Sequence, residues 1–392
     1  MRAPGRRRPR PGAAVIPFNK PFMTGQEQVN IAQAHANGHL SGDGPFTKQC
    51  HAWLNRQTGA SASLLTHSCT SALEMAALLL DLVPGDEVIM PSYTFVSTAN
   101  AFVLRGAVPV FIDVRADTLN IDERLIERAI TPRTKAICVV HYAGVSCEMD
   151  EILAIAERHG LAVVEDAAQG IMSTYKGRPL GTIGDLGALS FHETKNIISG
   201  EGGALLCRDR EHAERAEIIR EKGTNRSRFF RGQVDKYTWV DVGSSFLPGE
   251  ITAAFLSAQM DAAEDITTRR LAIWDRYHGW AEKHERDGKL QRPTVPAYCT
   301  HNAHMYYVLL PSLDARSRFI AEMKQRGVQT VFHYIPLHSS PAGQELGRTG
   351  SDMAVTDDIS VRLVRLPLWV GVEEDMETLL QHADAALDVA LG

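Results

Sequence analysis

The sequence has no run of about 18 apolar residues, and this absence excludes a membrane-spanning helix of the usual length. Its six cysteines include no CxxC pair, so their spacing fits neither a zinc site nor a disulfide framework, and reduced thiols in a cytoplasmic protein are expected. The 15 histidines show no metal-ligand spacing such as HExxH. No bound metal is therefore predicted.

A surplus of positive charge is also missing. The chain has 41 Lys and Arg against 47 Asp and Glu, a formal net charge of -6, which argues against general binding to nucleic acid or to a membrane surface. The exception is the arginine-rich stretch at residues 1–14, which no apolar secretory segment follows. It is either a basic arm for an anionic partner or a disordered tail, and its Pro- and Gly-rich composition favours the tail.

What the chain does contain is a regular alternation of strand and helix patterns. From about residue 60, short apolar runs at residues 87–90, 107–113, 135–142 and 161–164 predict strands. Helical spacing predicts helices at residues 71–82 and 149–159, and another that begins at Asp122 as its N-cap. This βαβ rhythm predicts an α/β fold with a mainly parallel sheet.

The pattern changes after residue 265, which suggests a second unit in this chain of 392 residues. A long helix is expected at residues 266–285, strands at 303–310 and 328–334, and a helix at 317–326. We therefore predict three parts: a disordered basic tail at residues 1–14, a large domain at 15–265, and a smaller C-terminal α+β domain at 266–392.

Four short motifs carry candidate chemistry. Asp166 follows a predicted strand, at the sheet edge where ligands gather, and Lys195 follows another short strand. Cys69 and Thr70 precede a helix whose N-terminus can bind a phosphate, and Phe95 follows a strand as a candidate aromatic for stacking. A lysine amine, a carboxylate, a phosphate site and a stacking ring are what pyridoxal phosphate (PLP) chemistry requires.

Each motif alone also has an ordinary structural interpretation. A single lysine is most often a solvated surface charge, and Asp166 could be part of a helix cap or a surface pair. Thr70 before a helix is most often a plain cap. Cys69 could be reactive because helix N-termini lower thiol pKa, although a small packed residue is the simpler interpretation.

Together and in this order, the motifs resemble the DegT-like family of nucleotide-sugar aminotransferases, from about residue 16 onward. The shared stretches are residues 85–95, 106–113, 165–169 and 190–196. The resemblance implies a PLP-dependent aminotransferase of fold type I, with a large domain built on a mainly parallel sheet and a smaller C-terminal domain. It also implies L-glutamate as amino donor and a homodimer with an active site shared between subunits.

The resemblance assigns a role to each motif. Lys195 would hold PLP and move the proton, Asp166 would pair with the pyridine nitrogen, and Gln169 would contact the ring hydroxyl. The remaining cofactor contacts would be a stacking ring and phosphate ligands: Phe95, Ser190, Cys69 and Thr70. Many relatives add an asparagine from the second subunit, within a Gly-Tyr-Asn-Tyr-Arg stretch. Here Ser245 takes its place within residues 243–247, and the arginine of that stretch is absent.

Three further stretches, residues 191–195, 229–237 and 332–338, resemble the branch that aminates dTDP-4-keto-6-deoxyglucose to dTDP-4-amino-4,6-dideoxygalactose. They imply that His333, Tyr334 and His338 face the cofactor. Arg231 and Lys236 would meet the diphosphate and thymine, unless they belong to a surface loop and the histidines to the core. Two alternatives stay open: an aminotransferase for another nucleotide keto-sugar, such as a 3-keto sugar, and a non-catalytic PLP-fold regulator. A regulator would be expected to lose the lysine or the carboxylate, and both are present.

Overall fold

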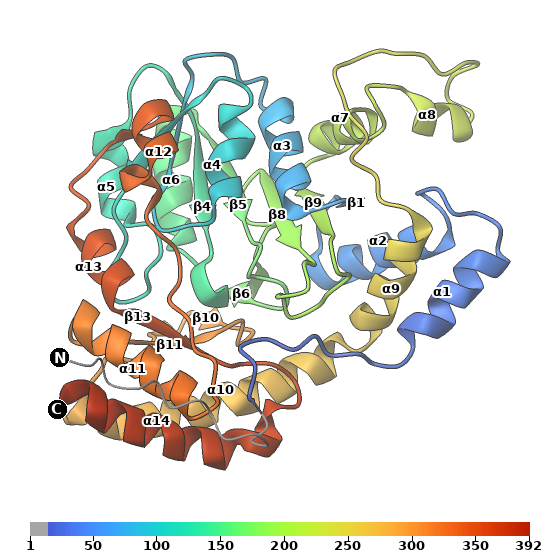
Figure 1. Ribbon diagram of the computed structural model, residues 1–392. Helices are drawn as coiled ribbons and strands as arrows, with labels where there is room; N and C mark the ends of the chain where they lie inside the picture. Colours follow the sequence, from blue (N-terminus) through green and yellow to red (C-terminus); the bar gives the residue numbers. More distant parts are fainter. Residues whose placement is uncertain (1–14) are drawn as a thin grey trace, which may run out of the picture.

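The computed structural model describes residues 15–392, so the predicted tail at residues 1–14 lies outside the described residues. An eight-stranded sheet occupies the centre of the large domain, in the order β1-β9-β8-β5-β4-β2-β3-β12 (Figure 1). The ladder from β8 to β12 is parallel throughout, and only β8–β9 and β1–β9 are antiparallel. The predicted α/β fold with a mainly parallel sheet is confirmed. The strands are β1 (Ala62–Thr66), β2 (Glu87–Pro91), β3 (Val108–Ile112), β4 (Thr134–Val140), β5 (Ala162–Asp166), β8 (Leu186–Ser190), β9 (Gly203–Cys207) and β12 (Arg348–Thr349).

Helices cover both faces of this sheet. Because both faces of each strand are buried, the strands are continuous apolar runs in the sequence. Along β4, Ile137 and Val139 pack into one core while Ala136 and Cys138 pack into the other, as the two-residue period of a strand requires. One face is covered by α3 (Cys69–Leu79), α4 (Val96–Val103) and α7 (Arg210–Arg220). The other is covered by α2 (Pro45–Thr58), α5 (Glu123–Ala129), α6 (Met149–His159) and α9 (Glu250–Asp261).

Local signals placed these helices well. The predicted helix at residues 149–159 coincides with α6, and Asp122 caps α5 by accepting a hydrogen bond from the backbone N–H of Arg124. The predicted helix at 71–82 begins earlier, at Cys69, and ends at Leu79. Its cap is Ser68, whose hydroxyl accepts a hydrogen bond from the N–H of Ser71 at 3.1 Å.

The C-terminal part packs around its own core below the large sheet (Figure 1). Its antiparallel pair of strands, β11 (Tyr306–Leu309) and β13 (Leu363–Leu366), is packed against α10 (Ala263–Arg286), α11 (Leu313–Gln325) and α14 (Met376–Leu391). Between α11 and β13 in the sequence lie α12 (Pro341–Leu346), β12 and α13 (Ala354–Arg362). This segment packs on the large domain, where β12 pairs with β3. The division at residue 265 stays a proposal, since α10 begins just before it and β12 belongs to the larger sheet.

One predicted strand is wrong. Residues 328–334 form no strand, and the segment has only isolated bridges, from Val328 to Ile16 and from Val331 to Arg365. The consecutive residues His333 and Tyr334 both line a cavity, whereas neighbouring residues of a strand point to opposite faces. The strand expected at 303–310 is present but shorter, as β11.

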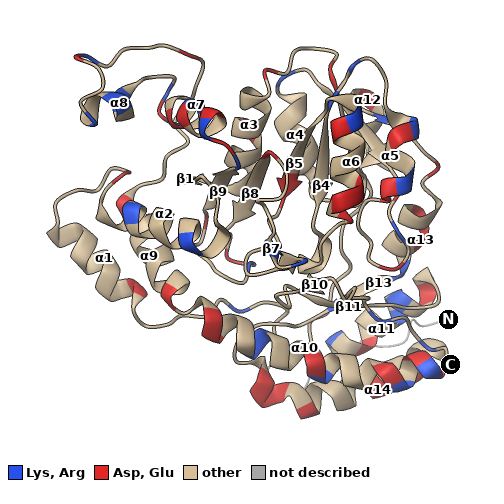
Figure 2. Ribbon diagram, turned by 180° about the vertical axis from the view of Figure 1, so that it is seen from behind, with Lys and Arg blue, Asp and Glu red and all other residues tan. Residues whose placement is uncertain are grey.

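The helices α1 (Glu27–Ala36) and α8 (Arg226–Phe230) lie at the periphery (Figure 1). A small sheet of β6 (Thr174–Tyr175), β7 (Arg178–Pro179) and β10 (Cys299–Thr300) lies between the large sheet and the C-terminal part (Figure 1). Basic and acidic side chains are interspersed along outer helices such as α5 and α14 (Figure 2). Among residues 15–392, none of the helices combines the length and apolar character needed to cross a bilayer.

Candidate active site

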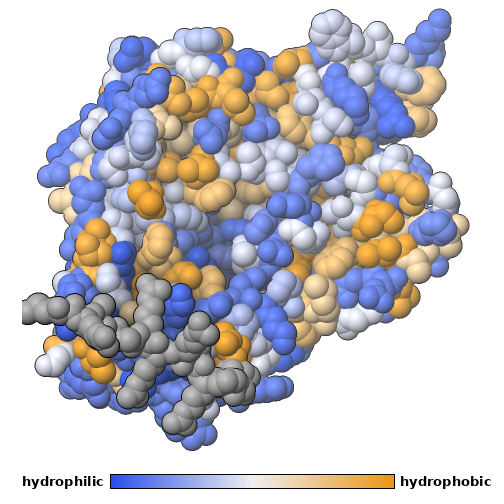
Figure 3. Space-filling view, in the orientation of Figure 1, coloured by the Kyte–Doolittle hydropathy of each residue, from blue (hydrophilic) through white to orange (hydrophobic). Residues whose placement is uncertain are grey.

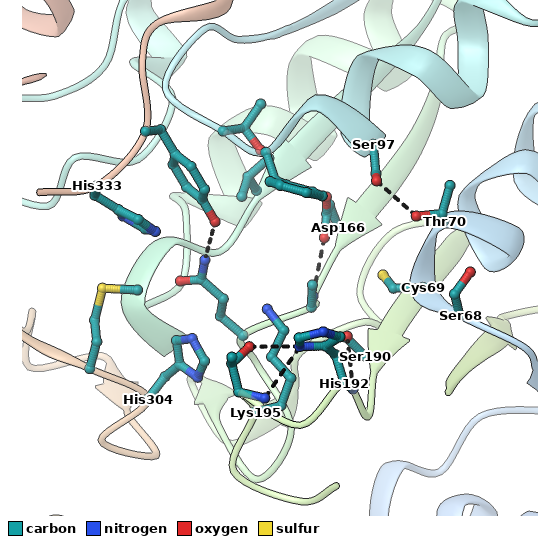
Figure 4. Close-up of a pocket in the computed structure, with 18 of the residues that line it drawn as sticks. Ser68, Cys69, Thr70, Ser97, Asp166, Ser190, His192, Lys195, His304 and His333 are labelled. Atoms are coloured by element: carbon teal, nitrogen blue, oxygen red, sulfur yellow. Dashed lines mark hydrogen bonds between the residues drawn. The ribbon is translucent and has the colours of Figure 1, made fainter. Parts of the chain in front are cut away.

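A cavity of about 520 Å³ opens at the carboxyl ends of the central strands, between the large sheet and the C-terminal part. Most of the residues singled out from the sequence line it, and Figure 4 shows the side chains that converge there. Its size is within the range of small-molecule and cofactor sites. Within residues 15–392, no three His, Cys, Asp or Glu side chains are grouped so that they could hold a metal ion.

Asp166 is the last residue of β5 and is buried at the floor of the cavity. The hydroxyl of Thr98, itself fully buried, donates a hydrogen bond to its Oδ2 at 2.7 Å, and the N–H of Ala168 donates to Oδ1 at 3.1 Å. Burial raises the pKa of the Asp166 carboxyl, whereas these two hydrogen bonds and the charge of Lys195 favour its ionised form. The carboxylate is thus held in one orientation in a poorly solvated place.

Lys195 lies in a tight loop after β8, and its side chain enters the same cavity (Figure 4). The backbone N–H of Lys195 donates to the carbonyl of His192 at 2.8 Å, and the N–H of Glu193 donates to the carbonyl of Gly200 at 2.8 Å. These bonds fix the loop on both sides of the lysine. Burial lowers the pKa of the Lys195 amine, which makes the neutral, nucleophilic form more available.

The N-terminus of α3 forms a third wall, opposite the lysine loop. The hydroxyl of Thr70 donates to Oγ of Ser97 at 2.7 Å, which joins α3 to α4. Gly203 permits this arrangement, because a Cβ there would lie 2.4 Å from the backbone nitrogen of Cys69. Burial raises the pKa of the Cys69 thiol well above its ordinary value, which is the reverse of what a reactive thiolate requires.

The fourth wall comes from residues far apart in the sequence. Gln169 donates a hydrogen bond from Nε2 to the hydroxyl of Tyr334 at 3.0 Å and accepts one from the N–H of Ala143 at 2.6 Å. The Tyr142 hydroxyl lies 2.7 Å from Nδ1 of His333, whose ring stacks on that of Tyr334 at a centroid distance of 3.6 Å. Because Nε2 carries two hydrogens, Gln169 can still donate one bond to a ligand.

Two further predicted cofactor contacts, Phe95 and Ser190, line the cavity but differ in how far they are exposed. Phe95 lines the cavity mouth, where its side chain is 57% exposed, so a ring-sized ligand could pack against it. Ser190, at the end of β8, is buried and also lines the cavity.

Four predicted residues lie outside this chain's own cavity lining. His338 is held by the hydroxyl of Ser92 at 2.8 Å. Arg231 forms an ion pair with Glu217 at 2.8 Å, and Lys236 is exposed in the same projecting segment around α8 (Figure 1). Ser245 forms an isolated bridge with Glu221.

Sequence reasoning missed several residues of the site. Thr98 and Ser97 were within reach of inference, because they begin the helix directly after Phe95. Asn196 lies next to Lys195 but outside the cavity lining, and no local pattern in the sequence indicates its partners. Its amide donates to the carbonyl of Asn302 at 2.7 Å, and its Oδ1 lies 3.0 Å from Nδ1 of His304, which does line the cavity. In the sequence, Arg365 is a single charged residue within the apolar run at residues 363–369, and nothing there indicates that it lines the cavity.

A buried pair lies directly behind Asp166. His141 and Glu165 are both buried, with Nε2 of His141 2.7 Å from the Glu165 carboxylate, which also accepts bonds from backbone N–H groups, including that of Gly181 at 2.8 Å. Nδ1 of His141 accepts the N–H of Cys147 at 3.2 Å, so the ring hydrogen lies on Nε2. This pair fixes the end of β5.

Known proteins are similar to this chain over most of its length. The model of the DegT/DnrJ/EryC1/StrS aminotransferase family matches residues 21–381. The spore coat polysaccharide biosynthesis protein SpsC of Bacillus subtilis (strain 168) is 35% identical over 371 residues, which cover 92% of this chain and 94% of that protein.

Two solved structures superpose closely. The aminotransferase TlmJ from Streptoalloteichus hindustanus has a TM-score of 0.88 at 30% identity, covering 97% of this chain and 100% of that one. The PLP form of the putative sugar aminotransferase Spr1654 from Streptococcus pneumoniae also has a TM-score of 0.88, at 26% identity, covering 96% and 100%.

Proposed function

Because this chain belongs to the DegT/DnrJ/EryC1/StrS aminotransferase family, we propose that it moves the amino group of L-glutamate to the 4-keto group of a nucleotide-linked 4-keto-6-deoxy sugar. It is a sugar aminotransferase with the fold of PLP-dependent aminotransferases, and PLP is its cofactor. The acceptor we propose is dTDP-4-keto-6-deoxyglucose, which would give dTDP-4-amino-4,6-dideoxygalactose. The observation that carries the proposal is the convergence of Asp166 and Lys195 on one cavity.

The residues of the cavity fit PLP at each of its polar groups. The N-terminus of α3 offers backbone N–H groups to a phosphate, and we propose that Cys69, Thr70 and Ser190 hold it. Asp166 would pair with the pyridine nitrogen, and Gln169 would use its free N–H on the ring hydroxyl. Phe95 would cover one ring face. When bound, PLP supplies an electron sink for the carbon that exchanges its amino group.

Lys195 would hold the cofactor covalently and, once displaced by the donor, act as the acid and base. Its amine would take the proton from the α-carbon of L-glutamate and return it on the other side of the transferred nitrogen. In the second half of the reaction it would deliver a proton to C4 of the sugar. A pKa lowered by burial suits this work, because the amine then gives up its proton more readily than an exposed lysine does.

The sugar would enter at the wall formed by His333 and Tyr334, whose side chains line the cavity together with Phe95. His338 lies outside the lining and would act by fixing the segment that carries them, through its contact with Ser92. This role for residues 332–338 agrees with their resemblance to the branch that aminates dTDP-4-keto-6-deoxyglucose.

We further propose a homodimer in which each chain completes its partner's cavity. Arg231 and Lys236 belong to the projecting segment, Ser245 follows that segment in the chain, and none of the three lines the cavity of its own chain. Exposed apolar side chains on this segment, on α1, in the loop after α1 and on α9 support a covered surface, and Figure 3 shows hydrophobic patches over α1 and α9. They are Val29, Leu40, Phe230, Trp239 and Ile251. Ser245 would then donate to the partner's cofactor, and Arg231 and Lys236 would meet the nucleotide diphosphate and thymine there.

The test is incubation of the holoenzyme with L-glutamate and a panel of nucleotide keto-sugars, followed by mass spectrometry and NMR of the product. Amination of dTDP-4-keto-6-deoxyglucose with an axial amine at C4 would support the proposal. Amination of a 3-keto sugar alone would favour the related enzyme. An enzyme whose visible cofactor band does not bleach with any amino donor would instead favour a regulatory protein.

A further inference from the structure

Arg365 lies in the middle of β13, with its side chain on the face that lines the cavity. Its neighbours Val364 and Leu366 pack into the C-terminal core, so the alternation of the strand turns Arg365 the other way. Its partner across the antiparallel ladder, Tyr307, is packed in the aromatic cluster with Tyr93 and Tyr142, between the two parts of the chain. The guanidinium is therefore directed toward the same space as the Lys195 amine.

This guanidinium is unusual because its charge is uncompensated. Nε is shielded from solvent and has no hydrogen-bond acceptor among the described residues, and no carboxylate there pairs with the group. Its side-chain neighbour is the ring of Phe18, 4.8 Å from the guanidinium carbon. By contrast, the nearby buried Arg270 donates to the carbonyls of Ala303 and His304. A cation left unpaired in a poorly solvated place is costly unless a ligand supplies the anion.

The acidic groups that line the cavity already have partners within the described residues. Two carboxylates line the cavity: Asp166 is engaged by Thr98 and Ala168, and Glu201 lies 3.7 Å from Nε2 of His192. The α3 N-terminus is placed for the cofactor phosphate. The anion for Arg365 must therefore come with the substrates. Every amino acid donor carries a carboxylate on the same carbon as the amine to be transferred, and that amine must reach the position of Lys195.

We propose that Arg365 binds the α-carboxylate of the amino donor, through the paired N–H groups of its guanidinium. This inference rests on the proposed aminotransferase reaction and adds the donor subsite to it. Binding there would orient the α-carbon of the donor toward the Lys195 amine. A carboxylate and a guanidinium that match in a desolvated pocket discriminate strongly against donors that lack the charge.

The test measures how fast L-glutamate bleaches the visible cofactor band of the holoenzyme, in single-turnover mixing without any keto-sugar. The variants are Arg365→Gln and Arg365→Lys, and the control is Arg318→Gln, a half-exposed arginine on α11 that pairs with Asp314. We expect Arg365→Gln to raise the half-saturating L-glutamate concentration roughly 100-fold, as loss of a desolvated charge pair does. Arg365→Lys should give a smaller rise, and the control should match the wild type.

A second arm compares L-glutamate with its α-amide, L-isoglutamine, which lacks only the charge in question. The wild type should need roughly 100-fold more of the amide, whereas Arg365→Gln should no longer distinguish the two donors. Titration of the wild type and Arg365→Gln holoenzymes with 2-oxoglutarate in a calorimeter should show a loss of affinity of similar size.

Three results would overturn the inference. One is an Arg365→Gln enzyme that keeps its cofactor band and the wild-type dependence on L-glutamate. Another is a variant that weakens only the step with the nucleotide keto-sugar, which would assign the guanidinium to the diphosphate. The third is a wild type that treats L-glutamate and L-isoglutamine alike, and this result decides even if the variants fail to fold. A wild type that bleaches with L-glutamate yet aminates no keto-sugar would refute the proposed acceptor and leave the Arg365 result intact.

Discussion

Asp166 and Lys195 meet in one cavity because the strands that precede them are neighbours: Asp166 pairs with Ala188 in the parallel ladder of β5 and β8. Burial moves the pKa values of the two side chains in opposite directions, up for the carboxyl and down for the amine. Hydrogen bonds from Thr98 and Ala168 oppose the rise in the pKa of Asp166, and the negative charge of Asp166 opposes the fall in the pKa of Lys195. Groups tuned in this way at the end of a parallel sheet are typical of active sites.

Asp166→Asn tests the acid. The variant keeps the shape and most hydrogen bonds of the side chain but removes the charge that would keep the cofactor ring protonated. We expect kcat to fall at least about 100-fold while bound PLP is retained, because the lost interaction acts mainly in the transition state. Steady-state kinetics and the visible spectrum measure the two effects. A variant with wild-type kcat would contradict the role of Asp166.

Thr98→Val tests whether the carboxylate must be held in place. Val has nearly the same shape as Thr but cannot donate to Asp166, and a hydrogen bond to a charged group contributes about 1.5–3 kcal/mol. We expect kcat/KM to fall roughly 10- to 100-fold and PLP to dissociate more readily. The matched control is Thr267→Val, since the Thr267 hydroxyl donates only within α10, to the carbonyl of Ala263. Equal effects of the two substitutions would argue against the positioning role.

The lowered pKa of Lys195 predicts a pH dependence for cofactor uptake by the cofactor-free enzyme. Only the neutral amine attacks the cofactor aldehyde, and a lower pKa keeps more of it neutral as the pH falls. The rate of reconstitution with PLP should therefore rise with pH and level off below the value of about 10.4 that is usual for lysine. Growth of the visible band from about pH 6 to about pH 11 gives the midpoint. A midpoint at or above the usual lysine value would show that burial does not tune this amine.

Glu87 predicts an acid-sensitive contribution to stability. Its buried carboxylate accepts hydrogen bonds from Arg348, Thr131 and Arg133, tying β2 to β12, and the bonds from Arg348 are the main cause that lowers its pKa to about 2. Because the folded-state pKa lies below the unfolded value of about 4.3, the stabilisation is complete above that value and is lost as the pH falls toward about 2.

Glu87→Gln should therefore lower the free energy of unfolding by roughly 2–3 kcal/mol at neutral pH and by less at about pH 3. Urea denaturation at several pH values measures the difference. Glu127→Gln is the control, because its carboxylate pairs at the exposed surface, with Arg158 at 3.1 Å and His159 at 2.9 Å, and little change is expected. A constant difference between wild type and Glu87→Gln across this pH range would rule out the carboxylate's charge as the cause.

The parts of the fold and of the site that could be predicted from the sequence are those determined by short, contiguous segments. Asp166 stood out because a buried parallel strand is an apolar run whose last residue falls at the ligand-binding edge. α6 was placed correctly because helical periodicity and its terminating Gly160 lie within one short segment. Lys195 was singled out by its position after a short strand and by the order of the surrounding motifs.

The rest depends on contacts between distant segments, which no local pattern records. The bond from Thr98 to Asp166 and the contact of Gln169 with Tyr334 exist only once the chain has folded. Residues 328–334 carry the apolar pattern of a strand, yet the cavity requires His333 and Tyr334 on one side. Which face of β13 carries Arg365 follows from its pairing with β11.

The most direct test of the central claim is reduction of the holoenzyme with sodium borohydride, followed by proteolysis and peptide mass spectrometry. We expect the pyridoxyl group on Lys195 and on no other lysine, and we expect Lys195→Ala to carry no label and to lose all turnover. A label on a different lysine, or a Lys195→Ala enzyme that still transaminates at a near wild-type rate, would contradict the assignment.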